Sequence, residues 1–207
     1  MGKITWMTRV IDTKAMHPDV PKGYRNNNPL NVRFSTKNDW EGQLGRDKSG
    51  MCVFCEMKYG IRAGIRLIAH YQLTYNKRAV KDIITRWTPK NANNTEAYIE
   101  CVCEHMQCEP EFAPRFGQDD KLGDCCRMIQ AMIMVENDGF RKDLCSWNTI
   151  RDAYTMAFPH LRLIPGLGDP DIAEALPENE DQEEVESVRI NYHDAFMEDR
   201  NSHFGTL

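Results

Sequence analysis

Apolar side chains recur every three or four residues over five stretches of the chain, which is the spacing of one face of an α-helix. The longest stretch begins near residue 59, where Ile61, Ile65 and Ile68 form a stripe. Asp138-Gly139 can end the fourth helix, because glycine readily takes the left-handed conformation that follows a helix. The pattern predicts helices over residues 59–75, 80–87, 95–105, 119–137 and 147–158.

A different pattern precedes these helices. Leu30, Val32 and Phe34 alternate with polar residues, which is typical of a short half-buried strand. The three asparagines before Pro29 favour a turn, since asparagine tolerates a left-handed backbone and bonds to its own main chain. Residues 40–50 are typical of a hairpin or loop, and residues 51–54 are expected to return as a second strand. The predicted fold class is mainly α (α+β), with one small β-hairpin near the N-terminus.

The formal net charge of −5 is unevenly distributed. Residues 166–207 contain 12 acidic and 2 basic residues, which leaves 19 acidic and 24 basic residues before them. We therefore expect a lead-in over residues 1–22, one domain over residues 23–165 and a partly disordered acidic tail over residues 166–207. A short docking helix is predicted within the tail, over residues 190–197.

Charge and hydropathy also exclude some classes of partner. The body is only mildly basic and lacks a basic patch interleaved with aromatic residues, so a nucleic-acid partner is not expected. Its positive charge suits approach to an anionic polymer. No apolar run approaches the roughly 20 residues of a membrane span. The N-terminal residues lack the basic-then-apolar pattern of a signal peptide, so we expect synthesis in the bacterial cytoplasm.

Eight cysteines are present. In a reducing compartment they are expected to stay free thiols and to serve as small hydrophobic residues of a helical core. The alternative is a zinc site built from Cys52, Cys55, Cys101 and Cys103. The second pair lacks the usual spacer of two to four residues, so no metal and no cofactor are predicted.

The fourth predicted helix carries the strongest candidate for catalysis. Cys126, Ile129 and Ile133 lie on one apolar stripe, and the next positions of that stripe are Glu136 and Phe140. Burial, the negative end of the helix dipole and the neighbouring Phe140 all favour a neutral carboxylic acid at Glu136. A glycosidase needs such an acid to protonate a leaving oxygen. The alternative is a frayed helix end at which Glu136 points to solvent.

The asparagine-rich segment is the candidate binding surface. Asn28 and Asn31 offer donors and acceptors to sugar hydroxyl and N-acetyl groups, and Trp40 can stack on a pyranose ring. Arg33 can add positive charge to such a groove. The alternative is a well-made turn with Trp40 in the core, and a charged surface that is only solvated.

An ordered series of motifs over about residues 23–140 resembles a family of bacteriophage and prophage proteins. Members are often labelled virion structural proteins and are related to lysozyme-like cell-wall enzymes. The resemblance implies a lysozyme-like helical domain and adds Trp87 and Tyr98 to the candidate substrate-binding residues. The motifs are Tyr24-Arg25-Asn26-Asn27-Asn28-Pro29-Leu30-Asn31-Val32-Arg33, Trp40-x-Gly42, Cys52-x-Phe54, Tyr59-Gly60-Ile61-Arg62-Ala63, Ile83-Ile84-x-Arg86-Trp87-x-Pro89 and Asn94-Thr95-x-x-Tyr98-Ile99.

The chain also resembles flagellar-type glucosaminidases, in which a catalytic glutamate precedes the asparagine-rich strand. Here the first glutamate is Glu41, after that segment. Instead, residues 135–140 resemble the Glu-Ser-Gly segment of lytic transglycosylases. A circularly permuted lysozyme-like domain would account for this order, and it requires Glu136 to lie beside a cleft lined by Asn28, Asn31 and Trp40.

The resemblance implies cleavage of a β-1,4 bond in peptidoglycan, with Glu136 as general acid. A hydrolase needs a second carboxylate, for which Asp39, Glu41 and Asp47 are candidates and Glu41 is preferred. A lytic transglycosylase would need Glu136 alone.

The competing interpretation is a non-catalytic virion, tail or wall-binding protein, with other virion proteins bound through the acidic tail. The protein is expected to be virion-associated or to act at the cell wall, with the virion preferred. A zinc-stapled nucleic-acid module is the weakest alternative.

Overall fold

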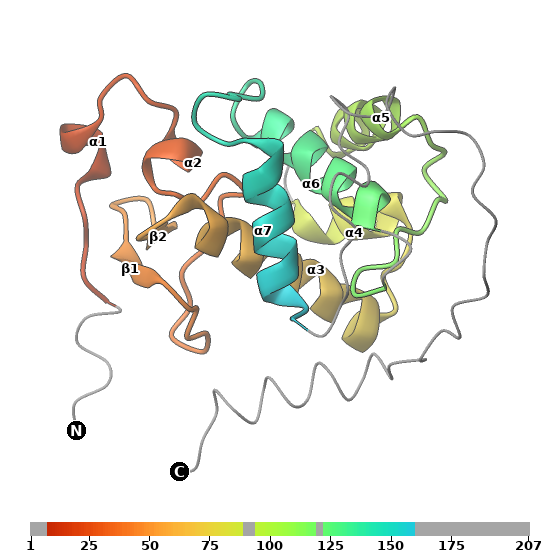
Figure 1. The fold of residues 1–207 in the computed structure, drawn as a ribbon, viewed down its shortest axis with the longest axis horizontal. Coiled ribbons are helices and arrows are strands. Elements are labelled where there is room, and N and C mark those ends of the chain that lie inside the picture. The colour runs from red at the N-terminus through yellow and green to blue at the C-terminus, as the bar shows by residue number, and fades with distance from the viewer. Residues whose placement is uncertain (1–7, 89–93, 119–121, 160–207) are drawn as a thin grey trace, which may run out of the picture.

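The computed structural model describes residues 8–88, 94–118 and 122–159, and the fold is mainly helical (Figure 1). The five predicted helices are confirmed, with ends within a few residues of those expected. The helices are α3 (Met57–Tyr75), α4 (Val80–Trp87), α5 (Thr95–Met106), α6 (Leu122–Glu136) and α7 (Trp147–Ala157). Two further helices of four residues each, α1 (Thr13–Met16) and α2 (Lys22–Arg25), precede them.

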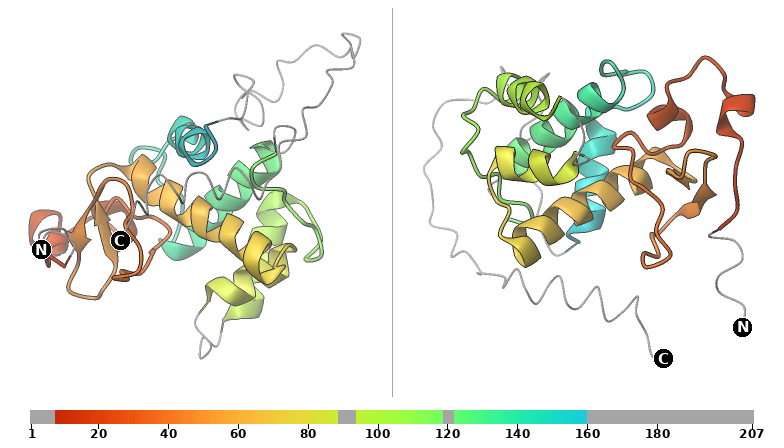
Figure 2. Two further views of the ribbon diagram at one scale, coloured as in Figure 1. Left: turned by 90° about the horizontal axis from the view of Figure 1, so that it is seen from below. Right: turned by 180° about the vertical axis from the view of Figure 1, so that it is seen from behind.

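The long helix α3 connects the two ends of the molecule (Figures 1 and 2). The small sheet packs near the start of α3, whereas α4, α5 and α6 gather at its other end. Helix α7 lies along α3 and also contacts α6. The stripe on α6 is buried as predicted, since Cys126, Ile129 and Ile133 have no exposed surface.

The sheet consists of β1 (Gln43–Arg46) and β2 (Cys52–Phe54), which pair in antiparallel fashion. The prediction of a strand over residues 30–34 is wrong. Only an isolated bridge between Arg33 and Met51 forms there, although Leu30 and Val32 are buried as the alternation predicted. The reason is local, because Asn31 has a left-handed backbone with φ of 51° and interrupts the extended conformation.

The segment expected as a lead-in contacts the hairpin. The Ile11 N–H donates to the Arg46 carbonyl at 2.8 Å, and the Arg46 N–H donates to the Arg9 carbonyl at 2.9 Å. The Thr13 hydroxyl donates to the Asn26 side chain. Residues 9–11 therefore pair with the end of β1, and Thr13, the first residue of α1, is bonded to the asparagine-rich turn.

Helix α3 approaches the asparagine-rich turn closely at Gly60. A Cβ atom there would lie 2.0 Å from the Asn27 carbonyl oxygen, so only glycine allows this packing.

The expected acidic tail and its docking helix lie outside the described residues. Within the described ranges, none of the helices is both long enough and apolar enough to cross a membrane.

Candidate functional site

The Glu136 side chain lies where four separate segments meet. Its Oε2 accepts a hydrogen bond from Asn31 Nδ2 at 2.9 Å. Its Oε1 accepts one from Trp87 Nε1 at 3.0 Å and one from the Tyr98 hydroxyl at 3.2 Å. These donors are 38 to 105 residues away along the chain. Glu136 is partly buried, and the three hydrogen bonds hold its carboxylate in a fixed position.

Asn31 joins the asparagine-rich turn to the end of α6. Besides binding the carboxylate, Asn31 Nδ2 donates to the Glu136 carbonyl at 3.2 Å. The buried side chain of Asn137 extends the junction, since its Nδ2 donates to the carbonyls of Pro29 at 2.7 Å and Ile133 at 2.8 Å. These bonds satisfy carbonyl groups that the end of a helix otherwise leaves without partners. The turn therefore sets the position of Glu136.

Trp87 and Tyr98 approach the carboxylate from α4 and α5. Trp87 is the last residue of α4, and Tyr98 lies in the first turn of α5 with 7% of its surface exposed. Burial, together with the charge of Glu136, raises the pKa of Tyr98 far above its usual value. The Tyr98 hydroxyl thus stays protonated and remains a donor to Glu136.

Aromatic side chains continue from Trp87 along the surface of α3. The ring centroids of Trp87 and Tyr71 are 6.3 Å apart, and those of Tyr71 and Tyr75 are 6.5 Å apart. The Arg86 guanidinium lies 5.0 Å from the Tyr71 centroid and 3.5 Å from that of Tyr75. The indole that holds Glu136 is therefore the first member of an aromatic group partly covered by an arginine.

A groove of about 810 Å³ borders the C-terminal end of α6. One wall is formed by Glu136 and the five residues after it, and the other by the α1–α2 segment. Asn31, Trp87 and Tyr98 are not among the lining residues, so Glu136 alone belongs to both the hydrogen-bonded cluster and the groove. The lining residues are Lys14, Pro18, Asp19, Val20, Pro21, Lys22, Arg25, Glu136, Asn137, Asp138, Gly139, Phe140 and Arg141.

The sequence patterns did not single out Asp19 and Asp138, which line this groove together with Glu136. Asp138 has a left-handed backbone with φ of 54° and lies in the loop that ends α6. Its closeness in sequence to Glu136 was a usable signal. Asp19 gave none, because it lies in the segment expected as a lead-in.

The other candidate carboxylates lie at the hairpin. Glu41 is exposed, and its Oε2 is 3.5 Å from Arg62 Nη2 on α3. Asp39 is exposed in the loop before β1. Asp47 is 6% exposed and accepts hydrogen bonds from the Ser49 and Met51 N–H groups and from Asn26. Burial raises the pKa of Asp47, but these bonds outweigh it and lower the pKa below its usual value. Asp47 therefore stabilises the turn between the two strands.

The remaining predicted binding residues, Asn28, Arg33 and Trp40, form no hydrogen bond with Glu136 among the described residues. Asn28 has no exposed surface, and its side chain bonds to the backbone of Val32 and Cys52, so it offers nothing to a ligand in this structure. Arg33 is exposed. Trp40 packs partly buried against the core, and its Nε1 is buried with no hydrogen-bond partner within the described part of the chain.

The cysteines are free thiols in the structure. Burial raises the pKa of Cys52, Cys126 and Cys145 to about 12, so these thiols are protonated at neutral pH. Across residues 8–88, 94–118 and 122–159, no three histidine, cysteine or acidic side chains are grouped to hold a metal ion.

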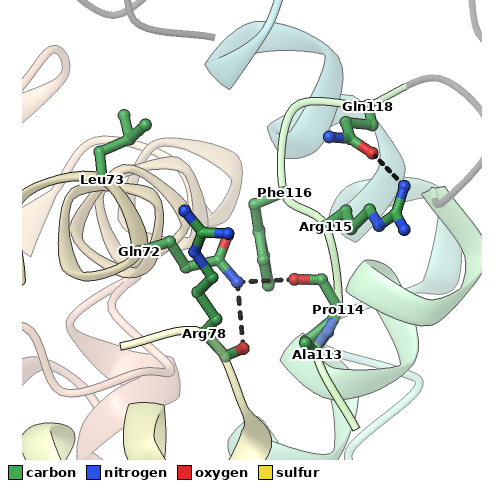
Figure 3. Close-up of a pocket in the computed structure, with 8 residues that line it drawn as sticks. All are labelled: Gln72, Leu73, Arg78, Ala113, Pro114, Arg115, Phe116 and Gln118. Carbon is green, nitrogen blue, oxygen red and sulfur yellow. Dashed lines mark hydrogen bonds between the residues drawn. The ribbon is translucent and has the colours of Figure 1, made fainter. Parts of the chain in front are cut away.

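A second pocket, of about 440 Å³, lies between the end of α3 and the loop at residues 113–118 (Figure 3). Gln72 spans it, since its Nε2 donates to the Pro114 carbonyl at 2.6 Å and to the Arg78 carbonyl at 3.4 Å. The Arg115 Nη1 donates to Gln118 Oε1 at 3.4 Å. None of the residues predicted for the site lines this pocket.

The fold and site define a mainly α-helical protein with a small antiparallel sheet and a partly buried glutamate at the meeting point of four segments. No known family model matches the chain. Protein P5 of Pseudoalteromonas phage PM2 is 36% identical to it over 134 residues, which cover 59% of this chain and 78% of that protein. The chain belongs to the same family as protein P5. The relative is a phage protein, in agreement with the expected phage association, and its name states no catalytic activity.

Proposed function

We propose that this phage-associated protein cleaves the glycan strands of peptidoglycan, with Glu136 as general acid. The observation that carries the proposal is the convergence of Asn31, Trp87 and Tyr98 on the Glu136 carboxylate. A carboxylate fixed by donors from distant segments, on a residue that lines an open groove, has the fixed position that acid catalysis requires. The proposal includes a lysozyme-like domain whose glutamate follows the asparagine-rich segment.

The two oxygens of Glu136 differ in their hydrogen bonds. Oε1 accepts two, from Trp87 and Tyr98, whereas Oε2 accepts one side-chain bond, from Asn31. We therefore assign the transferable proton to Oε2, which keeps a lone pair available. In the first step this proton passes to the bridging oxygen of the β-1,4 bond as the bond between that oxygen and C1 breaks.

The second step depends on whether another carboxylate acts. The hydrolytic route needs one that activates water or attacks C1, and Glu41 is the predicted residue. In the structure Glu41 is paired with Arg62, and no carboxylate bonds to Glu136 within the described residues. The route that needs Glu136 alone is attack on C1 by the 6-hydroxyl of the same sugar. Glu136 then accepts the hydroxyl proton, and the product carries a 1,6-anhydro ring.

The test is cleavage of purified peptidoglycan by the native protein and by Glu136→Gln. The substitution keeps the size and most hydrogen bonds of the side chain but removes the acid, so release of soluble fragments should fall about a thousandfold. Glu109→Gln removes an exposed acid elsewhere and should cleave like the native protein. Mass spectrometry of the fragments separates hydrolysis from anhydro-sugar formation.

Two outcomes would overturn the proposal. Unchanged cleavage by folded Glu136→Gln would refute the role of Glu136. If the folded native protein released no fragments, the catalytic proposal would be wrong and the non-catalytic virion or wall-binding role would replace it.

A further inference from the structure

The wall of the groove opposite Glu136 is basic. It contains Lys14, Lys22 and Arg25, which come from α1 and α2. Neither lysine forms an ion pair with any side chain that the structure describes. Arg25 Nη1 donates to the Val20 carbonyl at 3.0 Å, which holds the guanidinium against α2. Three cations thus line this wall of the groove, against one carboxylate, that of Asp19.

The same three side chains also line a neighbouring hollow of about 420 Å³. This neighbouring hollow runs from α1 to the turn between β1 and β2. There the carboxylate of Asp47 is already bonded to Asn26, Ser49 and Met51. Lys48, which lines it as well, is paired with Asp12. The excess of positive charge therefore lies at the junction of the two hollows rather than at the turn.

We propose that Lys14, Lys22 and Arg25 form a subsite for carboxylate groups of the peptide stems that peptidoglycan glycan strands carry. This inference rests on the proposed function, because it places the cleaved strand in the same groove. Ammonium and guanidinium groups bind carboxylates through charge-assisted hydrogen bonds. With Glu136 on one wall and the cations on the other, a strand bound at Glu136 presents its anionic stem to α1 and α2. The protein thereby selects peptide-bearing glycan over an uncharged β-1,4-linked glycan.

The experiment measures binding in the Glu136→Gln background, so that its result does not depend on cleavage. The full-length variant is titrated with soluble glycan strands that carry peptide stems and with the same strands after an amidase has removed the stems. Stem removal should weaken binding about fivefold, since two or three partly exposed charge pairs are lost. Adding Lys14→Gln and Lys22→Gln should weaken binding to peptide-bearing strands by a similar factor and leave binding to stripped strands unchanged.

The matched control adds Lys37→Gln and Lys81→Gln, which remove the same charge from other parts of the surface. Lys37 is exposed, and Lys81 forms an exposed pair with Glu111. Equal binding of both strand types by the Glu136→Gln protein would overturn the subsite. An equal loss in the control would overturn it too, because the effect would then reflect net charge alone. Thermal melting of each variant establishes that the measured losses belong to folded protein.

Discussion

Two carboxylates in this protein are bound by asparagines of the same turn, yet their surroundings differ. Asp47 accepts its bonds mainly within its own hairpin, from Ser49 and Met51, with Asn26 as the one partner from elsewhere. Glu136 accepts side-chain bonds only from other segments, and it borders an open groove. A buried carboxylate bonded to its own loop closes a turn. A carboxylate that distant side chains hold beside a groove is positioned to act on a ligand. This contrast is the reason to assign Asp47 a structural role and to propose a catalytic role for Glu136.

Asn28→Ala should produce the largest loss of stability. The Asn28 side chain makes three hydrogen bonds of 2.9 Å to the backbone of Val32 and Cys52, and its loss removes the acceptor of the buried Val32 N–H and one donor to each of the two carbonyls. We expect the free energy of unfolding to fall by about 4 kcal/mol, measured by urea denaturation. Asn38→Ala, in the next loop, should change it by less than about 1 kcal/mol. A loss below about 1 kcal/mol in Asn28→Ala would contradict the scaffold role of the turn.

Asp47→Asn should destabilise the protein by about 2 kcal/mol at neutral pH, because charge-assisted bonds to the Ser49 and Met51 N–H groups weaken. The effect should depend on pH. The folded-state pKa of Asp47 is lowered, so its contribution is present above the unfolded value of about 3.9 and is lost as pH falls through the folded value. Denaturation of native protein and variant at several pH values should therefore show the difference shrinking below about pH 4. A difference that stayed constant down to pH 2 would contradict this assignment.

Tyr98→Phe should have the smallest effect on stability and a distinct effect on cleavage. It removes one donor to Glu136, so kcat should fall about tenfold while KM changes little. Tyr154→Phe is the matched control, because the Tyr154 hydroxyl accepts a bond from the Gly117 N–H at 2.7 Å, in another part of the core. That variant should melt at a lower temperature with unchanged kcat. Equal kcat in Tyr98→Phe and native protein would show that the Glu136 cluster is structural, like the Asp47 turn.

Part of this site was predictable from sequence. Glu136 continues an apolar helical stripe, and the motifs singled out Asn31, Trp87 and Tyr98, which the structure brings to its carboxylate. Asn28 is buried, and neither Glu41 nor Trp40 bonds to Glu136 among the described residues. The spacing of residues along a chain carries no information on which of several loop side chains point to a given helix end.

The sequence by itself determined the five longer helices, because a period of 3.6 residues is a local property that burial of one face enforces. It also predicted the burial of Leu30 and Val32, but not that of Asn26 and Asn28. Tertiary structure decided that residues 30–34 form an isolated bridge instead of a regular strand, since Asn31 adopts a left-handed backbone while binding Glu136. It also decided that α1 and α2 line the groove. Helices of four residues are too short to leave a periodic signal. Only tertiary contacts position them, such as the bond of Thr13 in α1 to Asn26 and the bonds of Tyr24 in α2 to Gly139 and Arg141 after α6.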